Sequence, residues 1–126
     1  MPVVLDSSAI LAVLQDEPGR DLVTTHLPGA LLSTVNLAEA ITKLCQKGMS
    51  SIDAELAISE LHVTLIPFSA SHARSVGELR SVTKSAGLSL GDRACIALGI
   101  ERQAEVLTTD RAWATISVPT TLTVIR

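Results

Sequence analysis

Aromatic residues are nearly absent from this 126-residue chain, which has one Trp, one Phe and no Tyr. It therefore has no set of aromatic side chains on which the bases of a single-stranded nucleic acid could stack. An excess of positive charge is also missing, because the formal net charge is −3 at pH 7. Proteins that hold nucleic acid by charge alone are normally basic. If this chain acts on a polyanion, bound divalent cations are the groups that could attract the phosphates.

Long apolar runs and patterned cysteines are lacking as well. No apolar run approaches the roughly 18–20 residues of a membrane span, and the apolar N-terminal stretch carries Asp6 without the basic residues of a signal peptide. Cys45 and Cys95 lie far apart and follow no metal-binding spacing. We interpret them as two buried free thiols in a reducing compartment. These features lead us to expect a cytoplasmic protein that does not associate with membranes.

The residues that are present favour a dense aliphatic core, with 47% hydrophobic and 18% charged residues. The length fits a single domain over residues 1–126. Apolar periodicity and helix caps predict alternating strands and helices, which implies an α/β domain with a mainly parallel sheet covered on both faces. We expect strands near 3–5, 31–32, 63–66, 105–108 and 121–125, and helices over 9–15, 21–27 and 35–47, after Ser51, after Ser69 or Ser71, and from about 92 to 102.

Two of the predicted strands end at an aspartate, since Asp6 closes Val-Val-Leu-Asp and Asp110 follows Val-Leu-Thr-Thr. Ligands of open parallel sheets bind beyond the carboxyl ends of the strands, where both carboxylates would lie. The alternative is structural, because Asp is common at strand-to-helix turns, where it caps helices.

Two further acids are predicted near the same edge of the sheet. Asp92 fits a capping box with Ser89, which is a structural role, but it shares a helix face with Cys95 and so points to a covered region. A carboxylate there needs a partner, because an unpaired buried charge is costly. Glu39 alone would be an ordinary solvated helix residue. Its helix starts directly after a short strand, however, which brings its first turns to this edge.

Four converging acids would repel one another unless a cation lay among them. Mg²⁺ and Mn²⁺ suit an all-carboxylate site, and such a site supports attack of a metal-activated water on a phosphodiester. Around the acids we expect a hydrogen-bonded supporting shell of Ser7, Ser33, Asn36 and Thr108. Two arginines adjacent in sequence to the acids, Arg93 and Arg111, are candidates for holding an RNA backbone.

At these acids the sequence resembles the PIN-domain family. The match to that family extends over essentially the whole chain, and four segments match its acidic motifs in order: Val-Leu-Asp6-Ser-Ser, Ser33-x-x-Asn-x-x-Glu39, Leu88-Ser-Leu-Gly-Asp92-Arg-Ala-Cys and Leu107-Thr-Thr-Asp110-Arg-Ala-Trp. The Leu-Ser-Leu-Gly-Asp-Arg block is similar to one branch of the VapC toxins.

The resemblance implies a three-layer α/β/α sandwich and an endoribonuclease that depends on Mg²⁺ or Mn²⁺. It also implies the toxin of a toxin–antitoxin pair, a homodimer, and a VapB-type antitoxin that wraps the toxin and blocks its site. Carried over by position, Asp6, Glu39, Asp92 and Asp110 are the metal-binding and catalytic acids. The chain departs from some PIN branches, which end the fourth motif as Thr-x-Asn-x-x-Asp, whereas here Asp110 comes three positions earlier. The number of metals, one or two, is left open.

Parts of the sequence are also compatible with other functions. An aspartyl-phosphate enzyme would also place an Asp after the first strand, but a haloacid-dehalogenase-like phosphatase wants a second Asp where this chain has Ser8. A receiver domain wants a paired acid and a later Lys that are not present. A non-catalytic PIN-fold module for RNA or protein binding would not need four acids. A free-standing RNA-processing nuclease is the main competitor to a toxin.

Overall fold

A five-stranded sheet lies at the centre of the computed structural model, which describes residues 2–126. All strands are parallel, in the order β3-β2-β1-β4-β5. Their short aliphatic sequences alternate between the two faces of the sheet, so that Val4 and Leu5 enter different cores. The strand bounds are β1 Val4–Leu5, β2 Leu31–Ser33, β3 Thr64–Ile66, β4 Val106–Thr108 and β5 Leu122–Val124.

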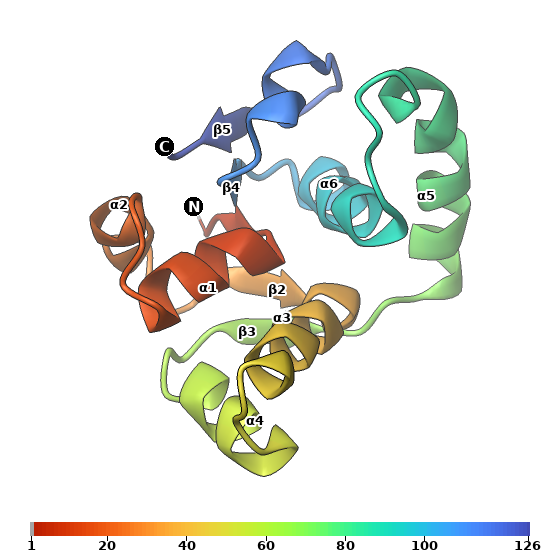
Figure 1. Ribbon diagram of the computed structural model, residues 1–126. Coiled ribbons are helices and arrows are strands. Elements are labelled where there is room, and N and C mark those ends of the chain that lie inside the picture. The colour runs from red at the N-terminus through yellow and green to blue at the C-terminus, as the bar shows by residue number, and fades with distance from the viewer. Residues whose placement is uncertain (1) are drawn as a thin grey trace.

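Helices cover both faces of this sheet (Figure 1), which confirms the expected three-layer α/β architecture. The core on one face joins Leu5 and Leu107 to helices α1, α3 and α4, and the other core joins Val4 and Val106 to α5 and α6. The helices are α1 Ser7–Leu14, α2 Arg20–Thr24, α3 Thr34–Gln46, α4 Ser51–Ser59, α5 Ala70–Thr83, α6 Leu90–Arg102 and the 3₁₀ turn Arg111–Thr115. Within residues 2–126, no helix has the length and apolarity needed to cross a membrane.

The position of β1 determines where a site can form. Strand β1 lies between β2 and β4, and since all three are parallel, their carboxyl ends share one edge of the sheet. Strand β1 leads into Asp6 and α1, β2 leads into α3, and β4 leads toward Asp110. Three segments distant in sequence therefore begin side by side at the edge where ligands of parallel sheets bind.

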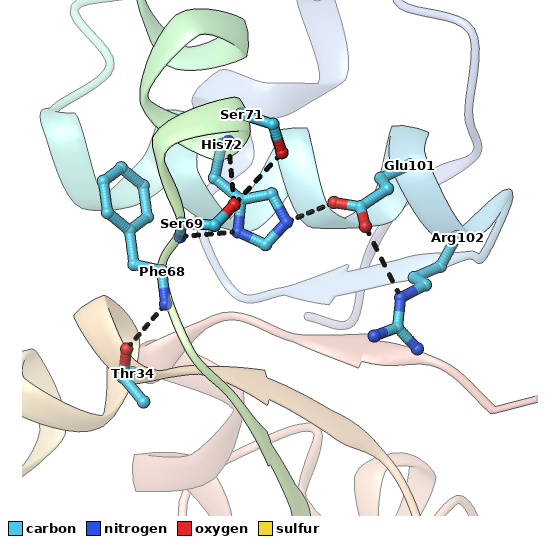
Figure 2. A network of polar contacts seen from close by, with 7 residues as sticks. All are labelled: Thr34, Phe68, Ser69, Ser71, His72, Glu101 and Arg102. Atoms are coloured by element: carbon cyan, nitrogen blue, oxygen red, sulfur yellow. Dashed lines mark hydrogen bonds and ion pairs between the residues drawn. The ribbon is translucent and has the colours of Figure 1, made fainter.

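Polar contacts around His72 tie α5 to its neighbours (Figure 2). His72 and Ser69 form a capping box, in which the Ser69 N–H donates to Nδ1 of His72 (3.3 Å) and the His72 N–H donates to Oγ of Ser69 (3.2 Å). Because Nδ1 accepts a hydrogen bond, Nε2 carries the ring proton and donates to the carboxylate of Glu101 at the end of α6. The Phe68 N–H donates to Oγ1 of Thr34, the first residue of α3 (3.0 Å). The start of α5 is thus fixed to both α3 and α6.

One expectation about the core was wrong. Cys95 is buried as expected, but Cys45 is exposed. The buried stripe of α3 runs through Asn36, Ala40 and Leu44, and Cys45 follows Leu44 by one residue. One residue is about 100° of rotation on a helix, which takes the Cys45 side chain past the edge of the buried stripe.

Candidate active site

Asp6 lies at the centre of the candidate site. It is the N-cap residue of α1, directly after β1, and its side chain is almost fully buried, at 3% exposure. Its Oδ2 accepts two hydrogen bonds, from Oγ of Ser8 (2.7 Å) and from Oγ1 of Thr108 (3.0 Å). Its Oδ1 is also buried but has no hydrogen-bond partner within the described residues. One oxygen of Asp6 is therefore held in place, while the other is left for a further ligand.

Two hydroxyl groups join Asp6 to the loop after β4. Oγ of Ser8 accepts from the Thr109 N–H (3.0 Å), and Oγ1 of Thr108 accepts from the Asp110 N–H (3.1 Å). Each hydroxyl thus accepts a hydrogen bond from a backbone N–H of the loop and donates a hydrogen bond to the Asp6 carboxylate. The sequence had suggested Ser7 for this supporting role together with Thr108, but in the structure Ser8 makes the contact. Ser8 lies two residues beyond the N-cap carboxylate, and that spacing is the signal that could have identified it.

Glu39 is positioned by contacts from two helices. Oε1 of Glu39 accepts a hydrogen bond from Nδ2 of Asn36 (2.9 Å), and the same amide group donates to the Gly91 carbonyl in the first turn of α6 (3.0 Å). A Cβ atom added at Gly91 would lie 2.1 Å from Oε2 of Glu39. The carboxylate of Glu39 therefore occupies the space that any side chain at position 91 would need. Sequence reasoning treated Gly91 only as part of a motif.

Asp92 lies in the next position of α6 and is partly buried. Its Oδ2 accepts from the Ser89 N–H (2.9 Å), and Oγ of Ser89 accepts from the Asp92 N–H (3.2 Å). This reciprocal pair is the capping box expected from the sequence. The capping role and proximity to the other acids are therefore combined in one residue.

The electrostatics indicate that three acids are close together. The pKa of Asp6 is raised from 3.8 to about 6, chiefly by burial and then by the negative charges of Asp92 and Glu39, against the opposing hydrogen bonds from Ser8 and Thr108. The pKa of the Cys95 thiol is also raised, first by burial and then by the same three carboxylates. Asp6, Glu39 and Asp92 thus form one cluster, to which we refer as the acid cluster.

Asp110 occupies a different environment from these three. It is exposed, and its Oδ1 accepts from the Ala112 N–H (2.9 Å) as the cap of the 3₁₀ turn. It is not among the charges that raise the pKa of Asp6. Its link to the acid cluster is indirect, through Oγ1 of Thr108, which bonds to both the Asp110 backbone and the Asp6 carboxylate.

Three other residues singled out in the sequence have contacts of their own. Oγ of Ser33 accepts from the Val35 N–H as the cap of α3 (3.2 Å). Nη1 of Arg93 donates to the Val76 carbonyl in α5 (2.9 Å), and its Nε is buried without a partner in the described part of the chain. Arg111 is exposed, and its Nε donates to the Arg126 carbonyl (3.3 Å). An RNA contact therefore remains a prediction for both arginines.

The chemistry of the acid cluster fits a hard divalent cation. Across residues 2–126, the side chains as they stand form no group of three or more His, Cys, Asp or Glu that could hold a metal ion. However, two buried oxygens at this edge, Oδ1 of Asp6 and Oδ1 of Asn36, have no partner among the described residues. Buried oxygen acceptors without donors, beside mutually repelling carboxylates, are the environment that Mg²⁺ or Mn²⁺ would stabilise.

Fold and site together define a class of protein: a parallel α/β domain with an acid cluster at the carboxyl edge of its central strands. The sequence matches the profile of the PIN domain over residues 3–118, and the chain belongs to the PIN domain family. A comparison with curated protein sequences gave no match.

Solved structures with the same fold share little sequence with this chain. VapBC2 from Rickettsia felis, bound to a promoter DNA fragment, has a TM-score of 0.73 at 19% identity and covers 98% of each chain. The sarcin-ricin loop cleaving toxin VapC20 of Mycobacterium tuberculosis has a TM-score of 0.73 at 17% identity, over 94% of this chain and 98% of that one. A toxin–antitoxin complex from Klebsiella pneumoniae has a TM-score of 0.68 at 18% identity, over 94% of this chain and 98% of the other. At such identities, the likeness is one of fold.

Proposed function

We propose that this protein is a Mg²⁺- or Mn²⁺-dependent endoribonuclease and the toxin of a VapBC-type toxin–antitoxin pair. One observation carries the proposal: in a PIN-domain chain, the buried carboxylate of Asp6 lies beside two further acids and presents an oxygen that has no hydrogen-bond partner among residues 2–126. A structural neighbour described as a toxin that cleaves the sarcin-ricin loop supports RNA as the substrate class. The sequence match of all four acidic motifs supports it as well.

Each acid would act from a position that its neighbours fix. Asp6, Glu39 and Asp92 would hold the cation, with Asp110 completing the set from the loop after β4. When bound, the cation lowers the pKa of water and neutralises charge that develops on the phosphate. Ser8 and Thr108 orient Asp6 through their donated hydrogen bonds, and Asn36 orients Glu39 in the same way.

The test is cleavage of total cellular RNA by the purified protein with Mg²⁺, with Mn²⁺ and with EDTA. Asp6→Asn should abolish cleavage while leaving the protein folded. A matched control is Asp53→Asn, because Asp53 is exposed in the first turn of α4. We expect discrete metal-dependent bands from the wild type and the control and none from Asp6→Asn. Cleavage by Asp6→Asn at the wild-type rate would refute the site, and no cleavage by folded protein free of antitoxin would favour a non-catalytic binding module.

The partners follow from the same proposal. Structural neighbours described as VapBC2 and as a toxin–antitoxin complex support a VapB-type antitoxin as the partner of this chain. We propose that the two meet in the cytoplasm. We also propose a homodimer, which exposed apolar residues such as Ile52 and Leu56 on α4 would help to stabilise. Light scattering of the purified chain tests the dimer. Co-purification with the product of a small adjacent gene tests the antitoxin and separates a toxin from a free-standing RNA-processing nuclease.

A further inference from the structure

Two grooves adjoin the acid cluster on either side of helix α3. The first, of about 440 Å³, is lined by Ser8 and Thr109, which contact Asp6 and its supporting loop, and by Lys43 and Lys47 at the end of α3. The second, of about 450 Å³, includes Glu39 itself. Lys43 and Gln46 line both grooves. The two grooves therefore meet along α3, and each opens next to a residue of the candidate site.

The first groove concentrates positive charge on an acidic protein. The chain has three lysines and a net charge of −3, yet Lys43 and Lys47 both line this groove and both are exposed. Arg126 also lines it, in an ion pair with Glu17 (3.6 Å) that offsets its charge. Neither lysine makes an ion pair within residues 2–126. Two uncompensated positive charges are thus available beside the acid cluster.

A structural explanation accounts for only part of this arrangement. Cations near the end of a helix are favoured by its dipole, and Lys43 and Lys47 lie in the last turn and at the C-cap of α3. The dipole would favour a lysine at this end of α3 whichever face of the helix it occupied. It does not require both side chains to line a groove whose other wall is Ser8 and Thr109. The dipole therefore does not account for the placement of the two charges.

The second groove has a different chemistry. Its walls are mainly apolar, with Val35, Ala38 and Leu90 beside Glu39 and Gly91. Leu90 is the first residue of α6 and is 56% exposed, although a leucine normally gains by being buried. The volume of the second groove is within the range of pockets that accept small organic molecules. An unpaired base, which has apolar flat faces, is a small group that would fit this groove.

We infer that a single-stranded RNA segment crosses α3, with phosphates on Lys43 and Lys47 in the first groove and a nucleoside against Leu90 in the second. This inference rests on the proposed nuclease function, because the acid cluster, which adjoins the first groove at Ser8 and the second at Glu39, would receive a phosphodiester of the bound segment. The path explains how an acidic chain with few aromatic residues holds a polyanion: local charge supplies the phosphate contacts, and aliphatic side chains replace the stacking platform.

Binding is tested with a labelled single-stranded RNA oligonucleotide and the non-cleaving Asp6→Asn chain, with Mg²⁺ present. Adding Lys43→Ala and Lys47→Ala should weaken binding at low salt at least tenfold. It should also reduce the slope of log affinity against log salt by about 1.4, since each phosphate contact on a single strand contributes roughly 0.7. Lys84→Ala is the matched control, because Lys84 lies at the C-cap of α5 and lines neither groove. It should leave both affinity and slope unchanged.

The apolar groove is tested by Leu90→Ala, which should weaken binding severalfold without changing the salt slope. Val82→Ala is its control, because Val82 is 51% exposed on α5 and lines neither groove. In the wild-type background, the double lysine variant should raise KM while kcat is preserved, because contacts remote from the reacting phosphate bind substrate and transition state alike.

The outcomes separate this inference from the proposed function. If the wild type cleaves RNA and Asp6→Asn does not, but the double lysine variant keeps the wild-type KM and salt slope, the path along α3 is wrong and the nuclease stands. If no metal supports cleavage, the nuclease proposal fails, while the binding measurements still decide whether RNA occupies the grooves. The five positions changed in these grooves and controls are all exposed, so the variants should fold, and circular dichroism verifies this.

Discussion

The carboxyl group of Asp6 is held where its charged form is unfavourable. Burial and the charges of Asp92 and Glu39 raise its pKa from 3.8 to about 6. The folded protein therefore binds a proton at Asp6 more tightly than the unfolded chain does. Well below pH 3.8 the group is protonated in both states and does not affect stability. As pH rises from about 4 to about 6, the unfolded chain ionises first, so stability falls, and it stays lower above pH 6.

This argument predicts how Asp6→Asn changes the pH dependence of stability in EDTA. A shift of about two pKa units corresponds to about 3 kcal/mol, so the wild type should lose up to that amount between pH 4 and pH 7 relative to the variant. Urea unfolding of both proteins at each pH gives the difference, in which the other titrating groups cancel. Parallel curves for the two proteins would contradict the raised pKa.

At the scale of elements, the close approach of α3 and α6 depends on Gly91. Gly91→Ala would place a Cβ atom 2.1 Å from the Glu39 carboxylate, which must then move. The displaced atoms end a flexible side chain, so the helix itself should tolerate the change. Alanine in place of glycine can stabilise a helix by up to about 1 kcal/mol. Activity and stability should therefore change in opposite directions.

We expect Gly91→Ala to keep or increase the free energy of unfolding and to lower kcat/KM roughly 10- to 100-fold, since small misplacements of catalytic groups cost that much. Gly77→Ala is the matched control in α5, where the added Cβ would meet nothing within 4 Å apart from its chain neighbours and the backbone of its own helix. It should be equally well tolerated and fully active. Wild-type kcat/KM in Gly91→Ala would show that the position of Glu39 is not critical.

The side chain of His72 joins the start of α5 to α6, and the loss of its contacts should lower stability rather than activity. His72→Ala removes one half of the α5 capping box and the hydrogen bond to Glu101, for an expected loss of roughly 2 kcal/mol in the free energy of unfolding. Glu101→Gln should cost less, because an amide oxygen still accepts from Nε2. Urea denaturation gives both values. Equal losses in the two variants would mean that the charge of Glu101, rather than its hydrogen bond, matters.

The elements themselves were largely predictable because their signals are local. Capping residues such as Ser69 and Ser89 start α5 and α6 where the sequence indicated, and the β-branched tail forms the edge strand β5. Asp6 and Glu39 were placed at one edge because each follows a strand of a parallel sheet. What could not be predicted depends on contacts distant in sequence. The choice of Ser8 over Ser7, the space that Glu39 takes above Gly91, and the groove beside Lys43 arise only when β1, α3 and α6 meet.

At the scale of the whole molecule, charge is distributed unevenly. A chain of net charge −3 gathers Asp6, Glu39 and Asp92 at one edge of its sheet, where they raise the pKa of Asp6, and places two exposed lysines next to them. Such a cluster destabilises the free protein. A cation that binds the cluster should therefore stabilise the entire fold, because it binds the folded state and not the unfolded chain.

The expected result is a rise in the melting temperature of the wild type with added Mg²⁺ or Mn²⁺. At a cation concentration 100 times Kd, the gain would be about 2.7 kcal/mol. Because the pKa of Asp6 is about 6, a proton competes with the cation below that pH, so the gain should be large at pH 8 and small at pH 5. Thermal unfolding with increasing cation measures this for the wild type, Asp6→Asn and the exposed control Asp53→Asn. Only Asp6→Asn should fail to respond at pH 8. An equal response from all three would mean that the cations act as general salt, and that the acid cluster does not hold them.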